Sequence, residues 1–232
     1  MDRSASVRAR GKRARAAIKA LAFDFDHTLG IDNKLERVAF LRLLEPQAPL
    51  VEEIEHVDAL LAQQRSGAFT IEQAVERFVR ERGVKDVPAY VGRYKRLCSE
   101  MVEAFVIPEP GARELCAQLH SRNIPHAILT NGWSPLQQRK AACVGFRGAV
   151  LVSSDIGTQK PSPQAFAALE QCLAVGAGEI AFVGDTPESD VAGSQRAGMF
   201  AVWYDAQRQP YPAALPPPAA TIHTLSEALE IL

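Results

Sequence analysis

Two aspartates that lie two residues apart follow a short apolar run near the start of the chain. Asp24 and Asp26 come after Leu21-Ala22-Phe23, which has the character of a buried strand. Because residues two apart on a strand share a face, the two carboxylates project together and repel each other unless a cation lies between them. Mg²⁺ prefers hard oxygen ligands and would relieve this repulsion, which would leave one carboxylate free to attack. An acidic turn is the alternative interpretation of this motif alone.

Three further polar motifs follow later in the chain. Thr130-Asn131-Gly132 follows an apolar run, and Lys160-Pro161 precedes a predicted helix; each is also an ordinary turn or helix-start sequence. Gly184-Asp185, with Asp190 five residues beyond Asp185, follows the apolar run 180–183. This fourth motif of the chain is the most specific, because unpaired charge at the end of a buried strand is costly.

The second half of the chain predicts a doubly wound parallel sheet. Short apolar runs alternate with amphipathic helices after residue 111, a pattern typical of α/β proteins. We expect strands at 127–129, 149–152, 180–183 and 201–204, and helices at 112–120, 136–142, 163–173 and 189–197. A Pro-rich surface loop at 210–218 and a closing helix at 225–232 follow. Ligands bind at the carboxyl ends of such strands, which is where the polar motifs fall.

Between the first and second motifs the pattern is helical almost throughout. Apolar residues recur at three-to-four spacing over 50–61 and 71–79, Thr70 and Gln73 form a capping box, and a third helix is expected near 90–101. Gly and Pro break the pattern at 46–49, 66–67 and 83–88. We therefore expect a basic tail over 1–19, an α/β core over 20–32 and 107–232, and a helical insert over 33–106.

The composition is that of an ordinary globular protein. The 232 residues carry a net charge of −1, so the molecule offers no broad basic field for nucleic acid or a membrane. No stretch approaches the roughly 20 apolar residues of a membrane span. Single, scattered cysteines argue against a zinc site or disulfide scaffold and suit a reducing cytoplasm. We interpret the Arg-rich start as a solvated tail, with an anion-binding arm or a transit-like segment as alternatives.

In their order the four motifs resemble those of the haloacid dehalogenase (HAD) superfamily, from about Ala22 to Met199. The resemblance implies a Rossmann-like α/β core with an inserted α-helical cap that closes over the site and excludes water. It implies a hydrolase that acts on a small phosphorylated metabolite with Mg²⁺ as cofactor. His27 stands where many relatives have Gly, and we interpret it as structural; Trp133 is interpreted as a packing residue, with a place at the pocket mouth as the alternative.

The resemblance also assigns roles. Asp24 would be the nucleophile that forms an aspartyl-phosphate, and Asp26 the general acid and base. Thr130 and the backbone beside Asn131 would hold the phosphate oxygens, while Lys160 neutralises phosphoryl charge. The Mg²⁺ ligands would be the Asp24 carboxylate, the Asp26 carbonyl oxygen, Asp185, and Asp190 directly or through water.

The second acid separates the candidate activities. A dehalogenase displaces halide and needs no acid to protonate an alkoxide, so Asp26 favours phosphate chemistry. A phosphomutase of the same superfamily would use the same residues, and a non-catalytic binding module on this fold is the alternative from another class. Phosphoglycolate, sugar phosphates and nucleoside monophosphates all stay open as substrates, because the shape of the cap decides among them.

Overall fold

The computed structural model describes residues 17–32, 34–43, 51–65 and 68–232. Within these residues, six parallel strands form one sheet in the order β5-β4-β1-β6-β7-β8. The strands are β1 (Ala20–Phe23), β4 (His126–Thr130), β5 (Ala149–Val152), β6 (Ile180–Gly184), β7 (Phe200–Tyr204) and β8 (Ala220–Ile222). The chain extends the sheet on one side of β1 and then on the other, so the doubly wound prediction is confirmed.

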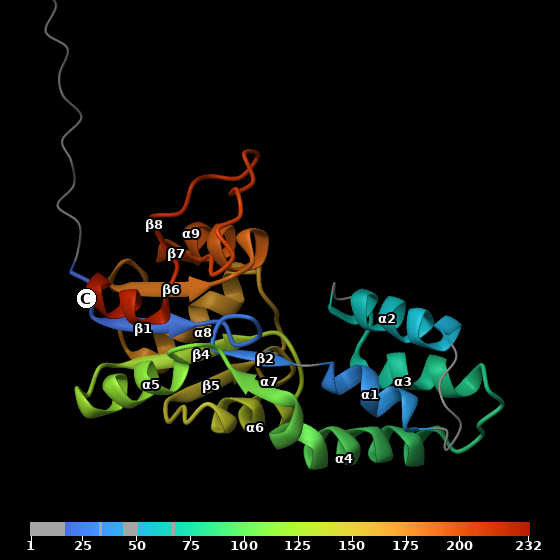
Figure 1. Cartoon of the computed structure of the whole chain (residues 1–232). Coiled ribbons are helices and arrows are strands. Elements are labelled where there is room, and N and C mark those ends of the chain that lie inside the picture. The colour runs from blue at the N-terminus through green and yellow to red at the C-terminus, as the bar shows by residue number, and fades with distance from the viewer. Residues whose placement is uncertain (1–16, 33, 44–50, 66–67) are drawn as a thin grey trace, which may run out of the picture.

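Helices cover both faces of this sheet (Figure 1). Along β1 the side chains alternate: Leu21 and Phe23 belong to the large apolar cluster that includes the inner faces of α5 (Ala112–Ser121) and α6 (Leu136–Cys143). Ala20 and Ala22 belong to a second cluster with Phe166 of α8 (Pro163–Leu173) on the opposite face. Since every residue of β1 is buried, the strand lies at the centre of the core and fixes the direction of the loop that follows it.

The segment between the first two motifs forms a separate helical unit. Its described helices are α1 (Leu35–Leu41), α2 (Val51–Arg65), α3 (Ile71–Arg80) and α4 (Val87–Phe105). Phe40 lies at its centre, with ring centroids 5.3 Å from Phe78 and 4.7 Å from Tyr94. The predicted capping box at Thr70 and the break before α4 are present, while the breaks at 46–49 and 66–67 lie outside the described residues. No helix in the described ranges is long and apolar enough to cross a membrane.

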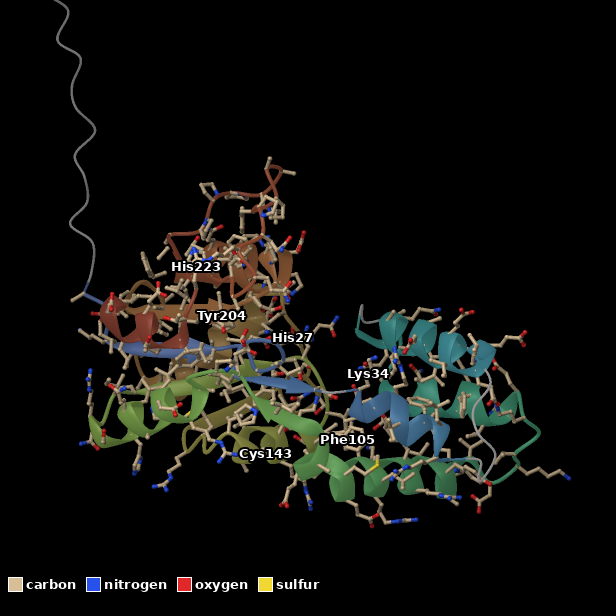
Figure 2. The ribbon with its side chains drawn as sticks, viewed as in Figure 1. His27, Lys34, Phe105, Cys143, Tyr204 and His223 are labelled. Carbon is tan, nitrogen blue, oxygen red and sulfur yellow. The ribbon has the colours of Figure 1, made fainter. Side chains whose placement is uncertain are left out.

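A short antiparallel pair of strands joins this helical unit to the core. β2 (Gly30–Asp32) leads into α1, β3 (Val106–Pro108) leads out of α4, and Asp32 pairs with Val106. The arrowheads of β1 and β6 point toward the helical unit, which therefore lies beyond the carboxyl ends of the central strands (Figure 1). Figure 2 marks its two ends at Lys34 and Phe105, with His27 on the core between them and the sheet.

Two predicted helices differ in form. The helix expected at 189–197 begins instead with a π-helical turn, Pro187–Val191 (η2), and continues as α9 (Ala192–Arg196). Such wide turns are frequent at functional sites, and this one contains Asp190. The closing helix is a 3₁₀ helix, Leu225–Ile231 (η3). The short elements β2, β3, β8 and α7 (Ser153–Ile156) were not expected, because three or four residues are too few to show a period.

Candidate active site

A buried lysine joins the first, third and fourth motifs at the carboxyl ends of β1 and β6. Lys160 Nζ lies 2.6 Å from Asp24 Oδ1 and 2.8 Å from Asp190 Oδ1. The three residues are at most 7% exposed. Burial alone would lower the pKa of Lys160, but the charges of Asp190 and Asp24 outweigh it and raise that pKa above its ordinary value. Lys160 is therefore a fixed positive charge beside Asp24.

The carboxylates exceed this one positive charge. Asp24, Asp185 and Asp190 each offer an oxygen, and these oxygens lie within 4.8 Å of one another. Burial is the main cause that raises the pKa of Asp24; Lys160 opposes the rise, and Asp190, Asp185 and Asp26 add to it. Burial and the charge of Asp190 raise the pKa of Asp185 to about 6. A cluster of hard oxygens that holds this excess negative charge fits a divalent cation.

The glycine of the fourth motif makes room for Asp190. A Cβ atom built on Gly184 would lie 2.5 Å from both Cβ and Oδ2 of Asp190, closer than real Cβ contacts allow. Without that Cβ, Asp190 folds back against the end of β6, where its Oδ2 accepts a hydrogen bond from Thr186 N at 3.0 Å. Trp203 on β7 donates its indole N–H to the carbonyl oxygen of Asp185 at 3.0 Å. The side chain of Asp190 and the backbone of Asp185 are thus each held by a hydrogen bond, from Thr186 and from Trp203 respectively.

The second motif holds the Lys160 loop in place. Asn131 Nδ2 donates to the carbonyl oxygen of Lys160, and Lys160 N donates to Asn131 Oδ1, both at 2.9 Å. This reciprocal pair occupies the amide side chain, so the group left to face a ligand at Asn131 is the backbone. Thr130, at the end of β4, is buried and its hydroxyl donates to the carbonyl oxygen of Asn131 at 3.4 Å. Phosphate binding by Thr130 and Asn131 stays a prediction.

Asp26 has a lysine of its own, which the sequence analysis missed. Lys140 Nζ lies 3.1 Å from Asp26 Oδ1, and Gln137 Nε2 donates to Asp26 Oδ2 at 3.4 Å. Both residues are on the inner face of α6 with Leu136 and Ala141, which are also buried. Two polar residues three positions apart on an otherwise apolar helix face are the signal that could have revealed them.

The family model of the haloacid dehalogenase-like hydrolases matches residues 18–198. The chain belongs to this family. It is therefore an enzyme of the hydrolase class.

Three relatives of this HAD-like hydrolase cover most of its length. The phosphoserine phosphatase of Thermus thermophilus is 30% identical over 207 residues, which are 83% of each protein. The HAD-hydrolase YfnB from Bacillus subtilis, in a crystal structure bound to magnesium, matches with a TM-score of 0.69 and 25% identity, over 93% of this chain and 99% of that one. The 2-haloacid dehalogenase of Pseudomonas syringae pv. Tomato DC3000 matches with a TM-score of 0.70 and 25% identity, over 92% and 97%.

Trp133 joins the core of this HAD-like hydrolase to its helical unit. The indole N–H donates to Glu36 Oε1 at 3.2 Å, and Tyr94 OH donates to the same oxygen at 3.1 Å. Trp133 is only 4% exposed, in accord with its interpretation as a packing residue. His27 is exposed, has a φ of 61°, and lies close enough to Asp185 to oppose the rise of its pKa.

We expect Asp185→Asn to stabilise the metal-free hydrolase near pH 7.5. The pKa of Asp185 is raised from 3.8 to about 6, so the folded state binds this proton more tightly than the unfolded chain. The associated stability is present below about pH 4 and is lost as the pH rises through about 6. Asn removes the cost of the ionised form, which we expect to be worth about 1–2 kcal/mol for this partly exposed carboxylate.

Urea unfolding in excess chelator at pH 4.5 and 7.5 measures the effect of Asp185→Asn. The variant should exceed the wild type in free energy of unfolding at pH 7.5, and the difference should shrink at pH 4.5. Glu188→Gln is the control, because Glu188 is an exposed carboxylate in the π-helical turn that follows Asp185. A variant less stable than the wild type at pH 7.5 would contradict the idea that Asp185 is held at a cost until a cation arrives.

Proposed function

We propose that this HAD-like hydrolase is a Mg²⁺-dependent phosphatase that cleaves a small phosphate monoester through an aspartyl-phosphate. The observation that carries the proposal is a pair of acids after β1, each beside a different buried lysine. Asp24 lies 2.6 Å from Lys160, and Asp26 lies 3.1 Å from Lys140. Two acids in separate surroundings suit two roles, since one must attack phosphorus while the other transfers a proton. The phosphoserine phosphatase of Thermus thermophilus is in accord with this chemistry.

In the first step a carboxylate oxygen of Asp24 forms a bond to phosphorus, and the bond from phosphorus to the alcohol oxygen breaks. Asp26 gives its proton to that oxygen, and the alcohol leaves. In the second step Asp26, now ionised, takes a proton from water; the water oxygen bonds to phosphorus, the bond from Asp24 breaks, and inorganic phosphate is released. Lys160 stays charged throughout and offsets the negative charge on the phosphoryl oxygens.

Magnesium would be held by the Asp24 carboxylate, the Asp26 carbonyl oxygen and Asp185, with Asp190 acting through water. We infer the indirect role of Asp190 from its own partners: Oδ1 accepts from Lys160 and Ser189, and Oδ2 accepts from Thr186 N. The bound cation would supply the positive charge that lets a phosphate dianion approach three carboxylates.

The proposal favours phosphate over halide chemistry, although a 2-haloacid dehalogenase shares the fold. A departing halide needs no proton, whereas an alkoxide does, so an acid two residues beyond the nucleophile has a use in phosphoryl transfer and none in halide displacement. We propose further that residues 33–106 act as a cap. In support, their helices lie beyond the carboxyl ends of the central strands and join the core through the β2–β3 pair (Figure 2).

Phosphate release from a panel of phosphate monoesters, with and without Mg²⁺, tests the function. We expect turnover with Mg²⁺ to fall by more than about 100-fold in excess chelator, because a bound metal contributes several kcal/mol to transition-state charge stabilisation. Added Mg²⁺ should restore it, and the free energy of unfolding should rise with Mg²⁺ at neutral pH. A 2-haloacid is the control substrate. Halide release without phosphate release would contradict the phosphatase, and full activity in chelator would contradict the metal.

A further inference from the structure

Lys140 is a buried charge that the proposed chemistry leaves without a role. It lies on α6, its side chain is 1% exposed, and its Nζ contacts Asp26 Oδ1 at 3.1 Å and Asp32 Oδ2 at 2.6 Å. Moving an ammonium group out of water costs several kcal/mol, and a buried ion pair seldom stabilises a fold more than apolar residues of the same size would. The stability of the fold therefore does not explain why a lysine is buried at position 140, whereas a role in placing its two partners does.

The contacts of α6 fix both oxygens of the Asp26 carboxylate. Lys140 holds Oδ1 and Gln137 Nε2 reaches Oδ2 at 3.4 Å, so rotation of the carboxylate about its last bond would break at least one contact. Asp26 keeps some access to solvent, since its side chain is 32% exposed while those of Lys140 and Asp32 are 1% and 13% exposed. The carboxylate of Asp26 is thus held by α6 without being fully buried.

Asp32, the other partner of Lys140, belongs to the entrance of the helical unit. It is the last residue of β2, and its Oδ1 accepts a hydrogen bond from Leu35 N at 2.7 Å, at the first residue of α1. One oxygen of Asp32 therefore holds the start of α1 and the other holds Lys140. The side chain of Lys140 links Asp26 to the point where the chain leaves the core.

We propose that Lys140 is a positioning residue: it sets the carboxylate of Asp26 at the angle needed to protonate a leaving oxygen, and it anchors that carboxylate to the β2–α1 junction through Asp32. The assignment rests on the proposed phosphatase function. Misplacing a reacting group by about 1 Å costs on the order of 100-fold in rate. The loss of rate should fall on substrates whose leaving group needs the proton of Asp26. A comparison of substrates with different leaving groups therefore detects the positioning role of Lys140.

The test compares Lys140→Met, which keeps an unbranched side chain one atom shorter and removes the charge, with Lys140→Arg, which keeps the charge. Arg139→Met is the matched control, because Arg139 is the preceding residue on α6 and is exposed. In single turnovers with Mg²⁺, phosphorylation of Lys140→Met by an alkyl phosphate should slow by about 100-fold, and by p-nitrophenyl phosphate by less than about fivefold. Lys140→Arg should recover part of the alkyl rate, and Arg139→Met should match the wild type.

Equal losses on the two substrates, or no loss on either, would overturn the role of Lys140. If Lys140→Met does not fold, Asp32→Asn replaces it, because Asn keeps an oxygen for Leu35 N while removing the charge that anchors Lys140; the same preference for the aryl substrate is expected, and equal losses again overturn the role. A wild type inactive on both substrates would overturn the phosphatase proposal and this assignment together. If the wild type is active, the phosphatase proposal stands, and the variants then test the role of Lys140 alone.

Discussion

Asp24→Asn should lower phosphatase turnover by about four orders of magnitude or more, because an amide cannot form the aspartyl-phosphate and the divided reaction becomes one unassisted displacement. The fold should survive. Asn has nearly the same shape, and Lys160 keeps Asp190 as a partner at 2.8 Å. Burial already raises the pKa of Asp24, so a neutral group in its place relieves a cost in the metal-free protein.

Steady-state hydrolysis of p-nitrophenyl phosphate and urea unfolding together measure the effect of Asp24→Asn. Acid-quenched wild-type protein should carry one phosphoryl group on the peptide that contains Asp24, and the variant should carry none. Glu188→Gln, an exposed carboxylate near the site, should keep wild-type turnover. Turnover of Asp24→Asn within about tenfold of the wild type would assign the nucleophile elsewhere, since loss of a covalent nucleophile costs far more.

The inner strands of the sheet, β4, β1, β6 and β7, were predictable because they are buried on both faces, whereas the edge strand β8 was not expected. The run 180–183 and its neighbours read as continuous apolar segments, and the observed β6, Ile180–Gly184, adds one residue to the expectation. The position of β1 between β4 and β6 depends on long-range pairing that no local pattern encodes. The π-helical turn at Asp190 was missed for a related reason, since it depends on the side chain folding back against Gly184.

In the candidate site, too, local patterns were predictable from the sequence and long-range contacts were not. The acids of Asp24, Asp26, Asp185 and Asp190 stand beside apolar runs, so their clustering could be expected from sequence, and the structure brings Asp24, Asp185 and Asp190 together. The inward direction of Lys140 could be expected from the apolar face of α6, but its partner could not, because Asp26 lies 114 positions away in the chain. The side chain of Asn131 was likewise taken up by Lys160, 29 positions on. Contacts of this kind depend on how the helices pack.

The largest difference between two substrates is expected for Asp26→Asn. An alcohol leaving group needs a proton, whereas p-nitrophenolate is a much weaker base and departs with little help. Loss of the acid should therefore slow phosphorylation of Asp24 by an alkyl phosphate about 10²–10⁴-fold, and by p-nitrophenyl phosphate far less. Because the carbonyl oxygen of Asn can still accept from Lys140, as Asp26 Oδ1 does, the side chain should stay near its place, while the longer contact of Gln137 with Oδ2 is lost.

The two steps of the Asp26→Asn reaction must be measured apart, because Asp26 is assigned to both. Breakdown of the aspartyl-phosphate is common to the two substrates, and it should slow equally for both since the same base is missing when water attacks. Steady-state rates limited by breakdown would therefore hide the difference, whereas rapid-quench single turnovers expose it. Equal damage to both substrates in the phosphorylation step would exclude Asp26 as the leaving-group acid; unequal damage there, with equal slowing of breakdown, is the pattern that a single carboxylate acting first as acid and then as base must give.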